Sequence, residues 1–102
     1  MTIPFDSIKD RVSQGYVRSL CERWLPHGQP KGAWWVARVP WREDRTPSLG
    51  VHLVSGNYKD FGRPEDRGDI ISLYAKLARV PVTDAAKAVA YMVGHEYGSY
   101  EQ

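Results

Sequence analysis

Apolar side chains recur every three or four positions between Phe5 and Trp24, which is the period of a helix with one buried face. Gly15 interrupts this pattern and predicts a break between two short helices. Residues 26–32 contain two prolines and two glycines, so we expect a loop there that ends the helical part.

The middle of the chain has the composition of strands. Residues 33–39 are rich in aromatic and β-branched side chains, and residues 49–54 alternate apolar with small or polar ones. The Ser-Gly-Asn tripeptide at positions 55–57 is a tight-turn signal before a third run at 57–61. The second and third runs therefore predict an antiparallel hairpin.

Alternation along these runs predicts which side chains face the core. The expected inward side chains are Trp35, Val39, Val51, Leu53 and Phe61. Trp34, Arg38 and His52 are then expected on the outer surface. Adjacent positions such as Tyr58 and Lys59 must lie on opposite faces. A slip of one residue in strand phase would exchange the two sets.

Two more helices are predicted after a polar loop that runs from Gly62 to Gly68. Asp69 is a good N-cap for a helix with an apolar face at residues 70–77. Thr83 is expected to cap the last helix, which Gly94 closes. We therefore expect a single domain, residues 1–102, divided into N-terminal helices (1–26), a sheet (33–63), C-terminal helices (69–94) and a frayed tail (95–102).

Composition narrows the class of protein. With 102 residues, 42% hydrophobic and 12% aromatic, the chain has room for one compact domain and not for a multidomain enzyme. Its net charge of +2 means that any nucleic-acid site must be local. Cys21 is the one cysteine, which excludes a Cys-x-x-Cys metal knuckle and an intramolecular disulfide and fits a reducing cytoplasm. No apolar run is long enough for a secretory signal or a membrane span.

Two short motifs frame the predicted hairpin. RTPSL at positions 45–49 precedes it, and RGDIISL at positions 67–73 follows it. Each alone is an ordinary turn or helix cap, but their order and spacing between Val39 and Val93 closely resemble the zinc-binding domain of bacterial and phage primases. In that family a Thr-Pro-Ser element, a hairpin, an aromatic strand and a Gly-Asp helix start follow one another in this order.

The resemblance implies an α+β fold, with a small antiparallel zinc-ribbon-like sheet of three or four strands between N-terminal and C-terminal helices. The positions that hold zinc in the family are occupied here by Val39, Arg42, Asp60 and Arg63. Arginine stays protonated and has no free lone pair for a metal, so we expect a ribbon without metal and without any cofactor. None of the three histidines lies at the knuckle spacing.

A ribbon without zinc needs another source of the stability that the metal would contribute. One candidate is the large aromatic complement, which would enlarge the core. A second is a charge cluster of Arg42, Asp60 and Arg63 at the position that the metal would have occupied. The alternative for these three residues is that they are solvated surface side chains, which as pairs contribute about 0–1 kcal/mol.

In primases the zinc ribbon reads the template, so the resemblance implies that this chain binds single-stranded DNA on the exposed face of its sheet. Such a surface needs cations for phosphates and flat side chains for bases. The candidate nucleic-acid-binding residues are Trp34, Arg38, Trp41, Arg42, Arg45, Lys59, Arg63 and Arg67. Trp41 has an alternative role as a packed aromatic cap on the degenerate knuckle.

The sequence contains no acidic set suited to two-metal phosphoryl transfer and no Walker loop, so we do not expect an enzyme. We expect a cytoplasmic accessory protein of DNA replication, of the kind that a phage or mobile element encodes. Its partners would be single-stranded DNA and a replication polymerase, primase or helicase in trans, with no membrane. The alternative is a pure protein-interaction module that recruits or inhibits a replication protein without binding DNA.

Overall fold

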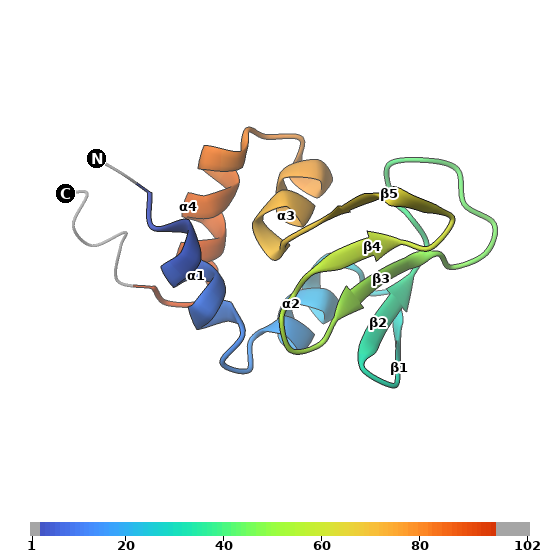
Figure 1. Cartoon of the computed structure of the whole chain (residues 1–102), viewed down its shortest axis with the longest axis horizontal. Helices are drawn as coiled ribbons and strands as arrows, with labels where there is room; N and C mark the ends of the chain where they lie inside the picture. Colours follow the sequence, from blue (N-terminus) through green and yellow to red (C-terminus); the bar gives the residue numbers. More distant parts are fainter. Residues whose placement is uncertain (1–2, 96–102) are drawn as a thin grey trace.

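Helices and a five-stranded antiparallel sheet make up residues 3–95, the part of the chain that this computed structural model describes (Figure 1). The helices are α1 (Phe5–Val12), α2 (Val17–Trp24), α3 (Ile70–Ala78) and α4 (Val82–Met92). The strands are β1 (Gln29–Lys31), β2 (Trp34–Ala37), β3 (Leu49–His52), β4 (Tyr58–Asp60) and β5 (Arg63–Gly68). The α+β class is confirmed, with five strands where three or four were expected. None of the described helices is long and apolar enough to cross a membrane.

The helices begin and end close to the predicted positions. Gly15 separates α1 from α2 with a φ of +110°, which only glycine adopts easily. Asp69 caps α3, because its side chain accepts the backbone N–H of Ser72 at 2.8 Å. The cap predicted at Thr83 is wrong: the N-cap is Pro81, two residues earlier, and its φ of −61° already suits a helix start. The predicted tail lies outside the described residues, apart from His95.

The sheet is a meander in which each strand pairs with the next along the chain. Two of its strands lie where the sequence predicted loops. β1 lies within residues 26–32 and pairs Gln29 with Val36 of β2. β5 replaces the polar loop predicted from Gly62 to Gly68 and pairs Arg67 with Lys59 of β4. Both are exposed edge strands with little apolar or β-branched content, so backbone pairing holds them in the sheet rather than side-chain burial.

One face of the sheet carries the core. Trp35, Val51 and Tyr58 lie opposite one another on β2, β3 and β4 and are buried, as is Val39 beyond the end of β2. The indole Nε1 of Trp35 donates to the backbone oxygen of Leu25 at 3.1 Å, which fastens the end of α2 to this inner face. At the far end of the molecule, α1 packs against α4 (Figure 1).

Two of the residues expected in the core depart from the prediction. Leu53 is only half-buried, because β3 has already ended at His52. Phe61 is 48% exposed and lies on the opposite face of the sheet from Trp35. The inward position at the end of β4 is taken by Asp60, which is fully buried. Strand alternation then sends Phe61 outward, to the same face as Lys59.

Candidate nucleic-acid interface

The turn between β4 and β5 is built around the carboxylate of Asp60. Arg42 donates two hydrogen bonds to it, from Nε to Oδ2 at 2.9 Å and from Nη2 to Oδ1 at 2.8 Å. The backbone N–H groups of Gly62 and Arg63 donate to Oδ1 at 2.9 and 3.2 Å. The hydrogen bonds from Arg42 lower the pKa of Asp60, against the opposing effect of burial. A bidentate guanidinium and two amides therefore keep this buried carboxylate ionised.

Asp44 folds the loop between β2 and β3 (residues 38–48) back on itself. Its Oδ2 accepts the backbone N–H of Val39 at 2.9 Å and that of Ser48 at 3.2 Å, and its Oδ1 lies 3.9 Å from Nη1 of Arg42. Burial raises the pKa of Asp44, but the hydrogen bonds from Val39 and Ser48 outweigh it and hold the pKa below its ordinary value. Asp44 thus joins the two ends of the loop and positions Arg42 beside Asp60.

The four degenerate zinc positions lie near this ion pair, but they do not fit a metal. The side chain of Val39 is buried in the core, and Arg42 is committed to Asp60. Within residues 3–95 no three His, Cys, Asp or Glu side chains are close enough to hold a metal ion. The charge-cluster hypothesis is confirmed for Arg42 and Asp60. Arg63 joins the cluster only through its backbone N–H, since its exposed side chain makes no ion pair with a described residue.

Trp41 lies beside this cluster and is held on several sides. Its Nε1 donates to Oδ2 of Asp66 at 3.0 Å, its ring meets that of Tyr58 edge-on at 5.9 Å, and Nζ of Lys76 lies 4.7 Å from its ring centroid. The carboxylate of Asp66 also accepts from the hydroxyl of Tyr58 at 3.1 Å and from Lys76. These contacts favour the packed-cap role of Trp41 over a role as a surface for bases.

The opposite face of the sheet carries an aromatic group centred on Trp34. The ring of Trp34 meets that of His52 at 5.2 Å and that of Phe61 at 5.5 Å, both in edge-to-face geometry. Gly50 lies beneath them, and a Cβ there would stand 2.5 Å from Cε2 of Phe61 and 3.0 Å from Cε3 of Trp34. Only glycine at position 50 lets the two rings lie against the strand. We call Trp34, Gly50, His52, Lys59, Phe61 and Arg67 the outer face.

Two cations lie next to the aromatic group on the outer face. Lys59 of β4 and Arg67 of β5 are directly opposite each other in the antiparallel register. Neither forms an ion pair or a side-chain hydrogen bond with any residue from 3 to 95. A shallow hollow of about 400 Å³ lies between them and Trp34. The outer face thus combines a cationic pair with an exposed aromatic surface.

The eight predicted nucleic-acid-binding residues therefore fall into separate places. Trp34, Lys59 and Arg67 are brought together on the outer face. Trp41 and Arg42 belong to the partly buried contacts around Asp66 and Asp60. The other three, Arg38, Arg45 and Arg63, are exposed at the loop end of the sheet, and Arg38 lines a different cavity.

Sequence reasoning assigned Phe61 to the core and gave Gly50 no role. The signal for Phe61 was present, because Tyr58 and Lys59 must lie on opposite faces and Phe61 lies two residues after Lys59. The prediction placed Phe61 in the core because its side chain is hydrophobic, although strand alternation from Lys59 places it on the outer surface. Gly50 gave no signal, since its function depends on two rings that come from other strands.

Known structures include one with this fold. It is the crystal structure of the Aquifex aeolicus primase with its zinc-binding and RNA polymerase domains, which this chain matches with a TM-score of 0.70 and 22% sequence identity. The match covers 86% of this chain and 21% of the primase chain, so the chain spans about a fifth of that protein's length. The expected likeness to a primase zinc-binding domain is confirmed at the level of the fold. No family model and no curated protein matches the sequence.

We expect Arg42→Ala to lower the free energy of unfolding by about 3–5 kcal/mol, because it leaves the buried carboxylate of Asp60 without its counter-ion. Arg45→Ala is the matched control from the same loop, where the exposed arginine has no ion-pair partner among the described residues. Its effect should stay within about 0.5 kcal/mol. Urea unfolding followed by tryptophan fluorescence measures both. Equal effects of the two substitutions would refute a structural role for the ion pair.

The side chains at the four degenerate zinc positions predict that folding of this chain is independent of zinc. A structural zinc site of this kind contributes about 10–16 kcal/mol to small zinc domains, so a ribbon that used one would unfold in chelator. We expect the melting temperature to be the same in EDTA and in added zinc chloride. Zinc content measured by atomic emission gives the complementary test. Stoichiometric zinc that EDTA removes together with the folded state would contradict the prediction.

Proposed function

We propose that this chain binds single-stranded DNA on its outer face and is a non-catalytic, metal-independent version of the primase zinc-binding fold. In this proposal it assists a replication polymerase, primase or helicase in trans. The observation that carries the proposal is the pair of opposed cations, Lys59 and Arg67, beside the half-buried ring of Trp34 and the exposed ring of Phe61.

The cationic pair is informative because like charges directly opposite on neighbouring strands destabilise a sheet. A cross-strand neighbour of opposite charge would remove this repulsion, yet Lys59 and Arg67 face each other with no acidic partner among residues 3–95. A phosphate group bound between them would remove it as well. The placement of these two cations opposite each other is therefore better explained by binding of an anionic ligand than by a contribution to the stability of the fold.

The aromatic side chains favour a single strand over a duplex. Proteins bind single-stranded nucleic acid by stacking unpaired bases on exposed rings along a positively charged groove. Phe61 is 48% exposed, and Trp34 and His52 are half-buried. The outer face carries no projecting helix that could enter a duplex groove, because the described helices lie on the inner side or beyond the end of the sheet (Figure 1).

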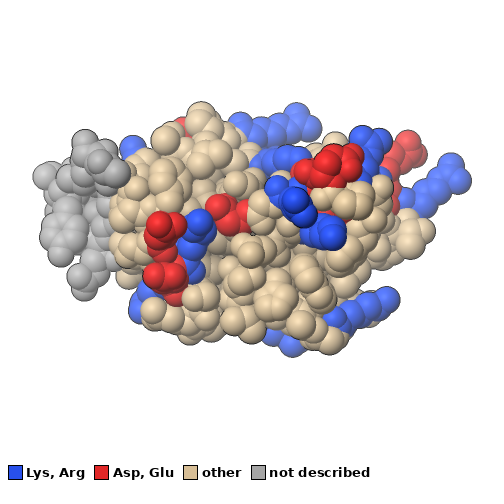
Figure 2. Space-filling view, in the orientation of Figure 1, with Lys and Arg blue, Asp and Glu red and all other residues tan. Residues whose placement is uncertain are grey.

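The distribution of charge also supports a local site. Figure 2 shows several Lys and Arg side chains over the end of the molecule that holds the sheet, with a few Asp and Glu side chains among them. The net charge of the whole chain is only +2. Binding by a diffuse positive surface would need a larger excess, so the affinity must come from a few placed contacts.

The proposal predicts saturable binding of a fluorescein-labelled oligothymidylate that weakens with salt. The slope of log affinity against log salt should become shallower by about 0.7 for each phosphate that the protein no longer neutralises. We therefore expect the double substitution Lys59→Ala/Arg67→Ala to reduce both the affinity and the steepness of the slope. Fluorescence anisotropy at several salt concentrations measures both quantities.

Lys87→Ala on α4 is the matched control, because Lys87 is exposed, lies outside the sheet and has no ion-pair partner among residues 3–95. It should leave the slope unchanged. An equal reduction in both variants would indicate diffuse binding and would reject the outer face as the site. Absence of any DNA binding at low salt would leave the alternative, a module that contacts only a replication protein.

Substitution of Phe61 tests stacking separately from charge. Stacking of one base on an aromatic side chain is worth about 1–3 kcal/mol, so Phe61→Ala should weaken binding by about 5-fold to 150-fold with an unchanged salt slope. Tyr91→Ala is the control, since Tyr91 is an aromatic residue on α4 that is 89% exposed. Unaltered DNA affinity in Phe61→Ala, with the fold intact by circular dichroism, would remove the aromatic group from the site.

A further inference from the structure

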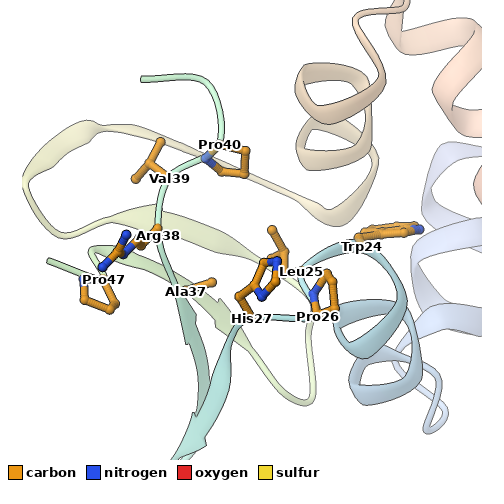
Figure 3. A pocket seen from close by; sticks show the side chains of 9 residues that line it. All are labelled: Trp24, Leu25, Pro26, His27, Ala37, Arg38, Val39, Pro40 and Pro47. Carbon is orange, nitrogen blue, oxygen red and sulfur yellow. The ribbon is translucent and has the colours of Figure 1, made fainter. Parts of the chain in front are cut away.

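A second surface lies at the end of β2, away from the aromatic group of the outer face. It is a cavity of about 720 Å³ between the C-terminal end of α2 and the first residues after β2 (Figure 3). Its walls are apolar and include Leu25, Ala37 and Val39 together with three prolines, Pro26, Pro40 and Pro47. None of the residues that line it is acidic.

Among the residues that line this cavity, the charged one is Arg38. Figure 3 shows Arg38 and Pro47 on one side of it, with His27 on the other. A smaller hollow of about 170 Å³ shares His27 and Pro47 with it and extends to Lys31 of β1. Neither Arg38 nor Lys31 has an ion-pair partner among the described residues. We call the two hollows together the basic groove.

The wall of the basic groove is held in place before any ligand binds. Leu25 accepts a hydrogen bond from Nε1 of Trp35, and Gly28 lies so close to that indole that a Cβ would stand 2.2 Å from Nε1. The backbone N–H of Gly28 also donates to the oxygen of Leu25 at 2.9 Å. Proline side chains add little freedom that a ligand would have to restrict. A ligand can therefore enter without first ordering this wall.

We propose that the basic groove binds an acidic segment of a partner protein, with a large apolar side chain of that segment in the cavity. The aliphatic and proline walls match such a side chain, and the cations Arg38 and Lys31 match carboxylates beside it. A nucleobase is a poorer match, because Trp24, the tryptophan that lines the cavity, already packs against Tyr74 with 5.0 Å between ring centroids.

This inference adds a site for the partner that acts in trans and is independent of DNA binding on the outer face. The two surfaces differ in their cations: Lys59 and Arg67 lie on the outer face, and Arg38 lies at the cavity. Lys31, the cross-strand neighbour of Trp34, lies between the two surfaces on the same face of the sheet as the aromatic group. A protein segment and a DNA strand could then be held at the same time. Each surface can be removed by substitution without the other.

The probe is a fluorescein-labelled peptide of three aspartates followed by leucine and phenylalanine, measured by anisotropy with the full chain. We expect saturable binding that the double substitution His27→Glu/Arg38→Glu weakens by about tenfold or more. Both residues lie at the surface of the cavity rather than in the core, so the folded state should persist. Replacing the leucine and phenylalanine of the peptide by serine should weaken binding by about tenfold as well.

Two single substitutions serve as controls. Lys59→Glu should weaken binding of oligothymidylate and leave the peptide unaffected, and Lys87→Glu should affect neither. Equal loss of peptide binding in Lys87→Glu, or unchanged binding of the serine peptide, would show attraction by charge alone and overturn the proposal. No peptide binding would overturn it too. If His27→Glu/Arg38→Glu instead abolishes DNA binding and spares the peptide, the groove belongs to the DNA site, which also overturns the proposal.

Discussion

Arg42 and the buried carboxylate of Asp60 form a bidentate ion pair at the loop end of the sheet. An ionised carboxylate that is fully buried would destabilise the fold by several kcal/mol unless it were paired and hydrogen-bonded. Arg42 and two turn amides provide this, and in doing so they tie the β2–β3 loop to the β4–β5 turn. One guanidinium thus joins the two segments, with Asp44 holding the loop that carries it.

The same ion pair has a consequence on the other side of the sheet. Since Asp60 takes the inward position at the end of β4, Phe61 lies outward, over Gly50 and against Trp34. The position of Phe61 in the aromatic group of the outer face therefore follows from the inward position of Asp60 in its ion pair with Arg42. A substitution that released Asp60 from Arg42 would disturb the proposed DNA surface as well as the stability of the domain.

The two proposed surfaces divide the chemistry of the chain between them. The outer face offers rings and paired cations, which suit bases and phosphates. The basic groove offers aliphatic and proline walls with separate cations at the rim, which suit an acidic protein segment with an apolar anchor. This division explains how a domain with a net charge of only +2 could have two anionic partners. The cations at each surface are few, but they lie beside rings on the outer face and beside an apolar cavity in the basic groove.

The helices, the central hairpin and the likeness to a primase zinc-binding domain can be predicted from the chain, because the apolar period, the turn residues and the order of motifs are local properties. The residue types at positions 39, 42, 60 and 63 also argue against a zinc site without any knowledge of the fold. That β1 and β5 are strands could not be predicted, since backbone pairing with a neighbouring strand defines these polar edges. Contacts between distant segments likewise place Arg42 against buried Asp60, while Lys59 and Arg67 have no acidic partner among residues 3–95. An arginine is equally charged in each place, and only its neighbours in space determine whether it stabilises the fold or is free to bind a ligand.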